Sequence, residues 1–220
     1  MPTLLLRMRA PMMSWGDHSR FTIRDTRREP TKSAVIGLLC AALGRPRWEP
    51  VNDLAALPMG VRVDKEGLVQ CDYHTVMDSI KSSGGKGDTV ISQRYYIADA
   101  DYLVGLEGKS AQLSELANAL QNPRWQIYFG RKSFVPSRPV YTHIIDLSME
   151  TALQQHPYGK GNQRLLPEEL RYVLEVTNSL DVRRDVPLDW QKRQFGSRCV
   201  ETKFVDMKSH SVEDLCISRN

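Results

Sequence analysis

The chain has 220 residues, of which 41% are hydrophobic and 25% charged, and its formal net charge is +4. These values are ordinary for a globular protein, and the longest apolar stretch, Ala34 to Leu43, is too short to span a bilayer. The four cysteines form no CxxC pair and the five histidines form no HExxH pattern, which argues against a zinc site. We therefore expect a cytoplasmic protein without a membrane partner, a bound metal or another cofactor.

The N-terminal third begins with a strand and contains one well-marked helix. Residues 3–9 alternate between an apolar side and a side that carries Arg7 and Arg9, which predicts a strand. Residues 11–29 show no period and are interpreted as a long functional loop. The apolar spacing that follows predicts a helix with Thr31 as its N-cap, ended by Gly44.

The middle of the chain alternates between strand patterns and a helix pattern. Residues 60–64 and 68–76 are predicted strands joined by a turn. The glycine- and serine-rich residues 77–94 predict a flexible excursion or an extended hairpin. Strand character returns over residues 95–106, and a helix follows that ends at Asn122-Pro123.

The order strand, helix, strands, helix, strand predicts an α+β fold of the ferredoxin-like or RRM type. Further strand patterns at residues 140–147, 172–176 and 199–205 indicate a smaller β-rich C-terminal part. We therefore expect an RRM-like domain over residues 1–139 and a second region over residues 140–220.

Two basic, turn-rich segments, residues 20–39 and 124–139, suggest a surface for an anionic polymer. Residues 116–145 contain no Asp or Glu, and their four positive charges equal the whole net charge of +4. A positive stripe on a nearly neutral body is typical of an anion-binding groove. The alternative is a solvated basic face without a ligand.

Candidate binding groups lie in both segments. Residues 31–33 place a cation and two hydroxyls at a helix start, where free N–H groups favour phosphate, although a simple capped helix is the alternative. Residues 128–133 combine aromatic rings with a glycine and two cations, as binders of single-stranded RNA do, unless the rings belong to the core. The candidate RNA-binding residues are Trp15, Arg24, Arg27, Thr31, Lys32, Ser33, Tyr73, His74, Phe129, Gly130, Arg131, Lys132 and Ser133.

Catalytic groups are sparse. Residues 14–18 contain Ser, Asp and His, but five consecutive loop positions cannot form a hydrolase triad. Tyr73 and His74 are the only cluster that could support acid–base attack of a ribose hydroxyl on its phosphate, and a structural strand histidine is the alternative. We predict no catalytic residue.

Four segments carry a resemblance to a known family. They are MRAPMMSWG (8–16), RDTRREPTKSAVIGLL (24–39), CDYHTV (71–76) and NPRWQIYFGRKSFVPSRPV (122–140), with a weaker match at RQFGSR (193–198). Together they resemble the type I-E members of the fifth-numbered CRISPR-associated protein family, which belongs to the RAMP superfamily.

The resemblance implies an RRM-like RAMP domain with a glycine-rich loop at residues 129–133 and a thumb hairpin at about residues 77–94. It implies a non-catalytic subunit of the antiviral CRISPR Cascade ribonucleoprotein complex that caps the complex's backbone and binds the 5′ handle of the guide RNA (crRNA). The implied partners are the backbone subunit and the large subunit, with target DNA nearby. A sister subtype cleaves repeat RNA with a Tyr/Lys/His set, so the alternative is a metal-independent endoribonuclease. His74 and Tyr73 are the nearest match to that set, without a Lys-His pair.

Overall fold

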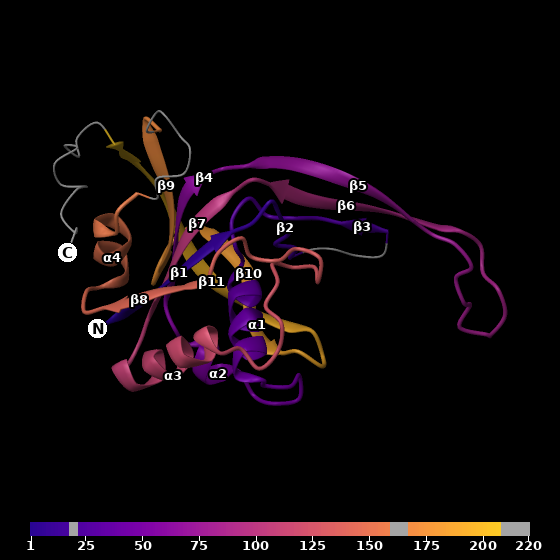
Figure 1. Cartoon of the computed structure of the whole chain (residues 1–220), viewed down its shortest axis with the longest axis horizontal. Coiled ribbons are helices and arrows are strands. Elements are labelled where there is room, and N and C mark those ends of the chain that lie inside the picture. Colours follow the sequence, from indigo (N-terminus) through magenta and orange to yellow (C-terminus); the bar gives the residue numbers. More distant parts are fainter. Residues whose placement is uncertain (18–21, 159–166, 208–220) are drawn as a thin grey trace.

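The computed structural model describes residues 1–17, 22–158 and 167–207. The first two residues of the basic segment 20–39 lie outside this part of the chain. A seven-stranded sheet forms the body of the molecule, and a smaller four-stranded sheet extends from it as an arm (Figure 1).

The central unit of the body is ferredoxin-like, as the sequence predicts. Its four strands are antiparallel and lie in the order β4-β7-β1-β8. Two helices connect them on one face, α1 after β1 and α3 after β7. The elements are β1 (Thr3–Arg9), α1 (Lys32–Leu43), β4 (Met59–Lys65), β7 (Asp101–Glu107), α3 (Ser110–Gln121) and β8 (Tyr141–Ile145).

The C-terminal strands extend the same sheet beyond β4. β9 (Glu169–Val176) pairs with β4, β11 (Gln194–Asp206) with β9, and β10 (Asp181–Asp189) with β11. The sequence pattern did not indicate β10, because its exposed and buried residues do not alternate regularly. β8 lies beyond residue 140 but completes the central unit beside β1, and the division of the chain near residue 140 stays a prediction.

Alternation along β1 separates the two faces of the sheet. Leu4, Leu6 and Met8 are buried on the face that α1 and α3 cover. Leu5 is buried on the opposite face, in a second cluster with α4 (Met149–Gln155). Arg7 and Arg9 share the face of Leu5 because side chains of a strand alternate.

Local capping sets the limits of α1 as expected. The Thr31 hydroxyl accepts a hydrogen bond from the backbone N–H of Ala34 at 3.3 Å, and Gly44 ends the helix at φ 72°. The short helix α2 (Asn52–Ala55) follows. No helix in residues 1–17, 22–158 and 167–207 is long and apolar enough to cross a membrane.

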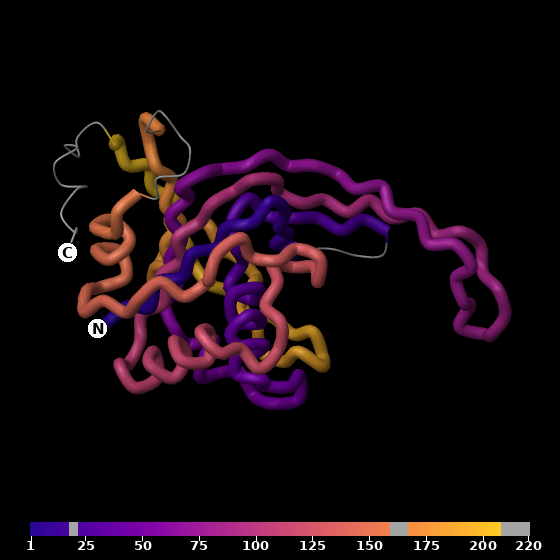
Figure 2. The backbone as a smooth tube through the Cα atoms, in the orientation of Figure 1, coloured from indigo at the N-terminus to yellow at the C-terminus, as the bar shows by residue number. Residues whose placement is uncertain are grey.

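The arm is a long hairpin that projects from the body (Figure 2). It consists of β5 (Leu68–Val76) and β6 (Val90–Ala98), paired along their whole length. The short strands β2 (Met12–Met13) and β3 (Ile23–Arg24) pair with β6 on its other side. The hairpin therefore starts earlier than the glycine-rich segment, which forms only its outer part. The predicted single strand over residues 95–106 is two strands, because the chain turns at Asp99, where φ is 57°.

Candidate nucleic-acid interface

A groove of about 780 Å³ lies beside α1. Its lining includes Ser33, Ala34, Gly37 and Ala41, small residues that follow one another along the helix. Small side chains let a ligand approach the helix closely. The rest of the lining comes from the residues around β2 and β3, from β6, from the chain just after α1, from the segment after α3, and from the β10–β11 turn with the start of β11.

Five arginines line the groove against a single acidic residue, Asp25, among the described lining residues. Arg45 is paired with Asp53 outside the lining at 2.6 Å, so four arginines and Asp25 leave a formal surplus of three positive charges. Such a surplus focuses a positive potential on a concave surface, which attracts anionic ligands. The arginines are Arg24, Arg45, Arg47, Arg94 and Arg131.

Three of these arginines come together where the arm meets the body. Arg24 and Arg94 are direct partners in the register of β3 and β6. The Arg131 guanidinium donates a hydrogen bond to the carbonyl oxygen of Tyr95 at 2.9 Å. Burial lowers the pKa of Arg131, and the nearby charge of Arg94 lowers it further. Like charges held this close repel each other, so an anion between them stabilises the cluster.

Aromatic rings stand on both sides of α1. Trp125, 46% exposed, and the exposed Tyr128 come from the segment after α3. Trp190 directly follows β10 and Phe195 lies at the start of β11; the two rings pack edge to face, with centroids 6.1 Å apart. Trp190 lies over Gly37, where an added Cβ would come within 3.9 Å of the indole. Exposed rings beside cations are the combination on which unpaired bases stack.

The glycine-rich loop reaches the groove through Gly130 and Arg131. Gly130 has φ 89°, and a Cβ there would lie 2.1 Å from the carbonyl oxygen of Ser14. The backbone N–H of Ser14 also donates to the carbonyl oxygen of Phe129 at 3.1 Å. Glycine is therefore required at position 130 first of all for the close contact between this loop and the chain after β2.

Two predicted stacking residues belong to the core. Trp15 is 1% exposed and Phe129 fully buried, and their ring centroids lie 5.5 Å apart. Trp15 also packs against the buried Tyr102. Neither ring can stack on a base in this structure, because the apolar body of the protein covers both. For Trp15 and Phe129 the prediction of base stacking is therefore wrong, and the alternative, that these rings belong to the core, is correct.

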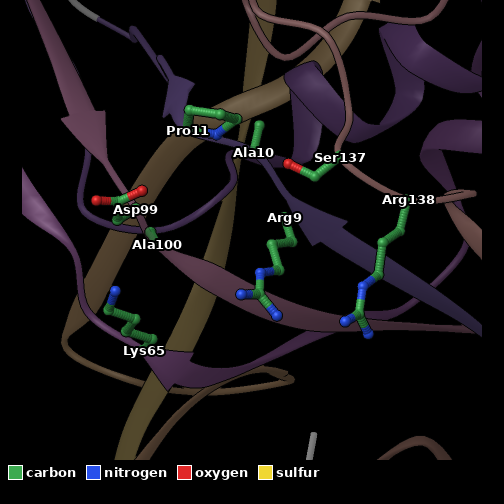
Figure 3. Close-up of a pocket in the computed structure, with 8 residues that line it drawn as sticks. All are labelled: Arg9, Ala10, Pro11, Lys65, Asp99, Ala100, Ser137 and Arg138. Carbon is green, nitrogen blue, oxygen red and sulfur yellow. The ribbon is translucent and has the colours of Figure 1, made fainter. Parts of the chain in front are cut away.

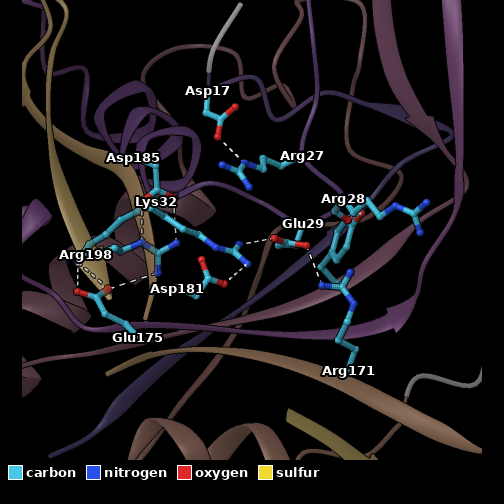
Figure 4. Close-up of polar contacts among 12 residues, drawn as sticks. Asp17, Arg27, Arg28, Glu29, Lys32, Arg171, Glu175, Asp181, Asp185 and Arg198 are labelled. Carbon is cyan, nitrogen blue, oxygen red and sulfur yellow. Dashed lines mark hydrogen bonds and ion pairs between the residues drawn. The ribbon is translucent and has the colours of Figure 1, made fainter. Parts of the chain in front are cut away.

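The predicted phosphate contact of Lys32 is also wrong for this structure. The Lys32 ammonium is buried and pairs with the carboxylate of Glu175 at 2.8 and 2.9 Å (Figure 4). Its backbone N–H donates to the carboxylate of Asp185 at 2.8 Å. Burial lowers the pKa of Lys32 despite the contact with Glu175. The sequence predicts a phosphate contact at the start of α1. In the structure, carboxylates of β9 and β10 take that place.

The remaining predicted residues divide between the groove and other surfaces. Arg24, Ser33, Gly130 and Arg131 line the groove. Arg27 lies outside it and forms an ion pair with Asp17, and Thr31 caps α1. Lys132 and Ser133 are exposed next to the groove but do not line it, and Tyr73 and His74 are exposed on the arm.

The groove also contains residues that the sequence did not single out, namely Arg45, Arg47, Arg94, Trp190 and Phe195. Phe195 lies within the weak match at residues 193–198, and Arg94 is the last residue of the predicted thumb segment, where nothing marks it as a ligand contact. Arg94 gave no signal, because its role depends on pairing with Arg24 across two strands.

A second ionic cluster connects the loop before α1 to the C-terminal strands. Arg171 and Arg183 both donate to the carboxylate of Glu29, the first of them at 2.8 Å (Figure 4). Burial by itself would raise the pKa of Glu29, but these two arginines lower it below its usual value. The charged form of Glu29 therefore stabilises the fold.

We expect this cluster to make stability depend on pH in acid. The unfolded chain binds the Glu29 proton more readily than the folded chain, so this contribution is complete above the usual glutamate pKa of about 4.3 and is lost as the pH falls further. Urea unfolding of Glu29→Gln is expected to show a smaller drop in the free energy of unfolding between about pH 5 and pH 3 than the unaltered chain. Parallel pH curves for the two proteins would contradict this assignment.

Comparison with known proteins identifies the family and supports the fold. A family model described as CRISPR-associated protein (Cas_Cas5) matches residues 3–201. The chain belongs to this family. Its sequence is 30% identical to the "CRISPR system Cascade subunit CasD" of Escherichia coli (strain K12), in an alignment that covers 89% of this chain and 92% of the relative.

Two solved structures are similar along nearly the whole chain. One, "Crystal structure of Cas protein", has a TM-score of 0.78 and 41% identity, and the match covers 94% of this chain and 96% of the other. The second is a chain of a "CRISPR RNA-guided surveillance complex", with a TM-score of 0.80, 30% identity and coverage of 93% and 90%. The Cas5-family fold expected from the sequence is thereby confirmed.

Proposed function

We propose that this chain is the Cascade subunit that binds the 5′ handle of the guide RNA and caps the backbone of the complex, without cleaving the RNA. The observation that carries the proposal is the groove beside α1, with its five arginines, one acidic residue and four aromatic rings. The CasD relative, a Cascade subunit by its description, supports the same assignment.

The groove suits a single strand of RNA better than a duplex. Arginines bind successive phosphates, while Trp125 and Tyr128 offer exposed faces to unpaired bases. The small residues of α1 let the strand lie close to the helix. A duplex keeps its bases stacked inside and would leave these rings unused.

We assign the contact with neighbouring Cascade subunits to the arm. Every residue of β5 is exposed, and the outer hairpin presents the apolar side chains of Val76, Met77 and Ile80 to solvent. An exposed apolar strand edge is a recognised site of pairing with another chain.

Replacing arginines of the groove is expected to weaken RNA binding and to lower its salt dependence. Arg94→Gln should reduce affinity for single-stranded RNA by roughly 3- to 10-fold and the salt slope by about 0.7, and adding Arg24→Gln should roughly double the change in slope. Fluorescence anisotropy with labelled RNA at several salt concentrations measures both quantities. Lys109→Gln is the matched control, because this exposed lysine lies outside the groove. If Arg94→Gln and Lys109→Gln have equal salt slopes of RNA affinity, the groove is not the RNA-binding site.

The endoribonuclease alternative is tested on the same preparation. His74 is exposed on the arm, and its imidazole Nδ1 lies 3.9 Å from the carboxylate of Asp72. We expect labelled repeat RNA to remain intact with the purified chain in the presence of a chelator. Discrete cleavage that disappears in His74→Ala would favour the enzyme instead.

A further inference from the structure

We propose that the chain has a second phosphate-binding site, on the face of the sheet opposite the groove. The site is a pocket of about 310 Å³ whose lining contains Arg9, Lys65 and Arg138 (Figure 3). Asp99 is the one acidic residue among the described residues that line it. The ligand class is a phosphodiester of a polynucleotide, and the site goes beyond the proposed function because it shares no residue with the groove.

The pocket lies at the base of the arm. Lys65 ends β4 just before the chain enters the arm, and Asp99 is in the turn where the chain returns from β6 to β7. Arg9 ends β1 on the same face as Leu5 and Arg7, whereas α1 and the groove belong to the face of Leu4 and Met8. A backbone hydrogen bond of 2.9 Å from Ser137 to Arg9 holds the segment with Arg138 beside β1.

The buried charges behind the pocket are balanced among themselves. Arg7 contacts Asp64 at 2.5 Å and Asp101 at 2.7 Å, and Arg62 contacts Asp64 at 2.6 Å. Two arginines thus face two carboxylates. Because these carboxylates are already engaged, they neutralise little of the charge of the pocket in front of them.

The cations of the pocket itself are in excess. Arg9 keeps only a 3.7 Å contact with Asp101. Within the described residues, neither Lys65 nor Arg138 has a carboxylate within 4.0 Å. Three cations against Asp99 leave a formal surplus of two positive charges, which is the charge that one or two phosphodiesters would neutralise.

The other lining residues favour a phosphate over a base. Ala10, Pro11 and Ala100 leave space, and the Ser137 hydroxyl is a neutral donor. The described lining includes no aromatic ring on which a base could stack. The volume is at the lower end of the range of about 300–1,000 Å³ typical of ligand pockets, enough for a backbone phosphate and its sugar. Figure 3 shows the Arg9 and Arg138 side chains extending in the same direction from neighbouring segments, and guanidinium groups bind phosphate oxygens well.

The decisive variant is Arg9→Gln/Arg138→Gln, compared with the control Lys109→Gln. The probes are a short single-stranded RNA that fills the groove only, a long single-stranded RNA, and a DNA duplex added after the groove is filled with the short RNA. We expect unchanged affinity for the short RNA, and a roughly 3- to 10-fold loss with a reduced salt slope for the long RNA or the duplex. Loss for the long RNA means that the strand in the groove continues to the pocket, and loss for the duplex means that a separate polynucleotide binds there.

Unchanged affinity and slope for both the long RNA and the duplex would overturn the second site. Because Arg9 touches Asp101, the variant Lys65→Gln/Arg138→Gln repeats the test without altering that contact, and thermal melting confirms that both variants are folded. The proposal that the groove binds RNA is tested separately. If that proposal is wrong, Arg94→Gln leaves the affinity for the short RNA unchanged.

Discussion

Asp185→Ala is expected to lower the free energy of unfolding by about 3–5 kcal/mol. The Asp185 carboxylate accepts hydrogen bonds from Arg198 at 2.7 and 2.9 Å and from the first backbone N–H of α1 at 2.8 Å. The side chain of Arg198 is only 4% exposed. Removing the carboxylate leaves a buried guanidinium without its two-point partner and the first N–H of α1 without its acceptor, while the Thr31 cap remains. Removing one partner of a buried ion pair is strongly destabilising, because the other charge stays buried without compensation.

Asp181→Ala is the matched control on the same strand. Its carboxylate is half exposed and lies 3.4 Å from Arg183, so its loss should cost less than about 1 kcal/mol. Chemical denaturation of both variants measures the difference. Equal costs for the two would show that Glu175, 3.5 Å from Arg198, takes over the role of Asp185.

Trp15→Ala is expected to destabilise the fold by about 3–5 kcal/mol, as truncation of a large buried ring usually does. Trp15 fills the space between Tyr102 and Phe129, and its backbone N–H donates to the hydroxyl of Thr26 at 2.9 Å. The cavity left behind would loosen the contact between the loop after β2 and the glycine-rich loop. Urea unfolding at neutral pH measures the loss.

Two other tryptophans separate stability from binding. Trp48 is 72% exposed, so Trp48→Ala should change stability by less than about 0.5 kcal/mol. Trp125→Ala should leave stability unchanged but cost roughly 1–3 kcal/mol of RNA-binding free energy if a base stacks on it. If Trp15→Ala leaves the free energy of unfolding unchanged but weakens RNA binding, Trp15 belongs to the RNA interface. That result would contradict its place in the core.

The regular elements with strong local patterns are predictable from the sequence. The alternation of residues 3–9 is β1, and the apolar spacing between Thr31 and Gly44 is α1. The sequence pattern does not predict β10, and it predicts one strand over residues 95–106 where the structure has two. Neither β10 nor the turn between β6 and β7 has a local period that distinguishes it. The central ferredoxin-like order followed from the order of the elements alone.

The candidate site is predictable only in part. The segments that carry Arg24, Ser33, Gly130 and Arg131 were identified by their charge and their glycine, and all four residues line one groove. Arg94, Trp190 and Phe195 were not, because they belong to elements whose proximity to α1 arises from sheet pairing far along the chain.

Composition and periodicity by themselves determine that this protein is an α+β domain with a cationic surface, since apolar spacing and clusters of like charge are local features of the sequence. They do not determine which cations face solvent. Lys32 and Arg131 look equally available in the sequence, yet Lys32 meets Glu175, 143 positions away, and is buried, while Arg131 reaches the groove. Burial of a charge depends on a partner brought close by folding, so only the tertiary structure could separate the ion pairs of the core from the arginines that remain available to a phosphate.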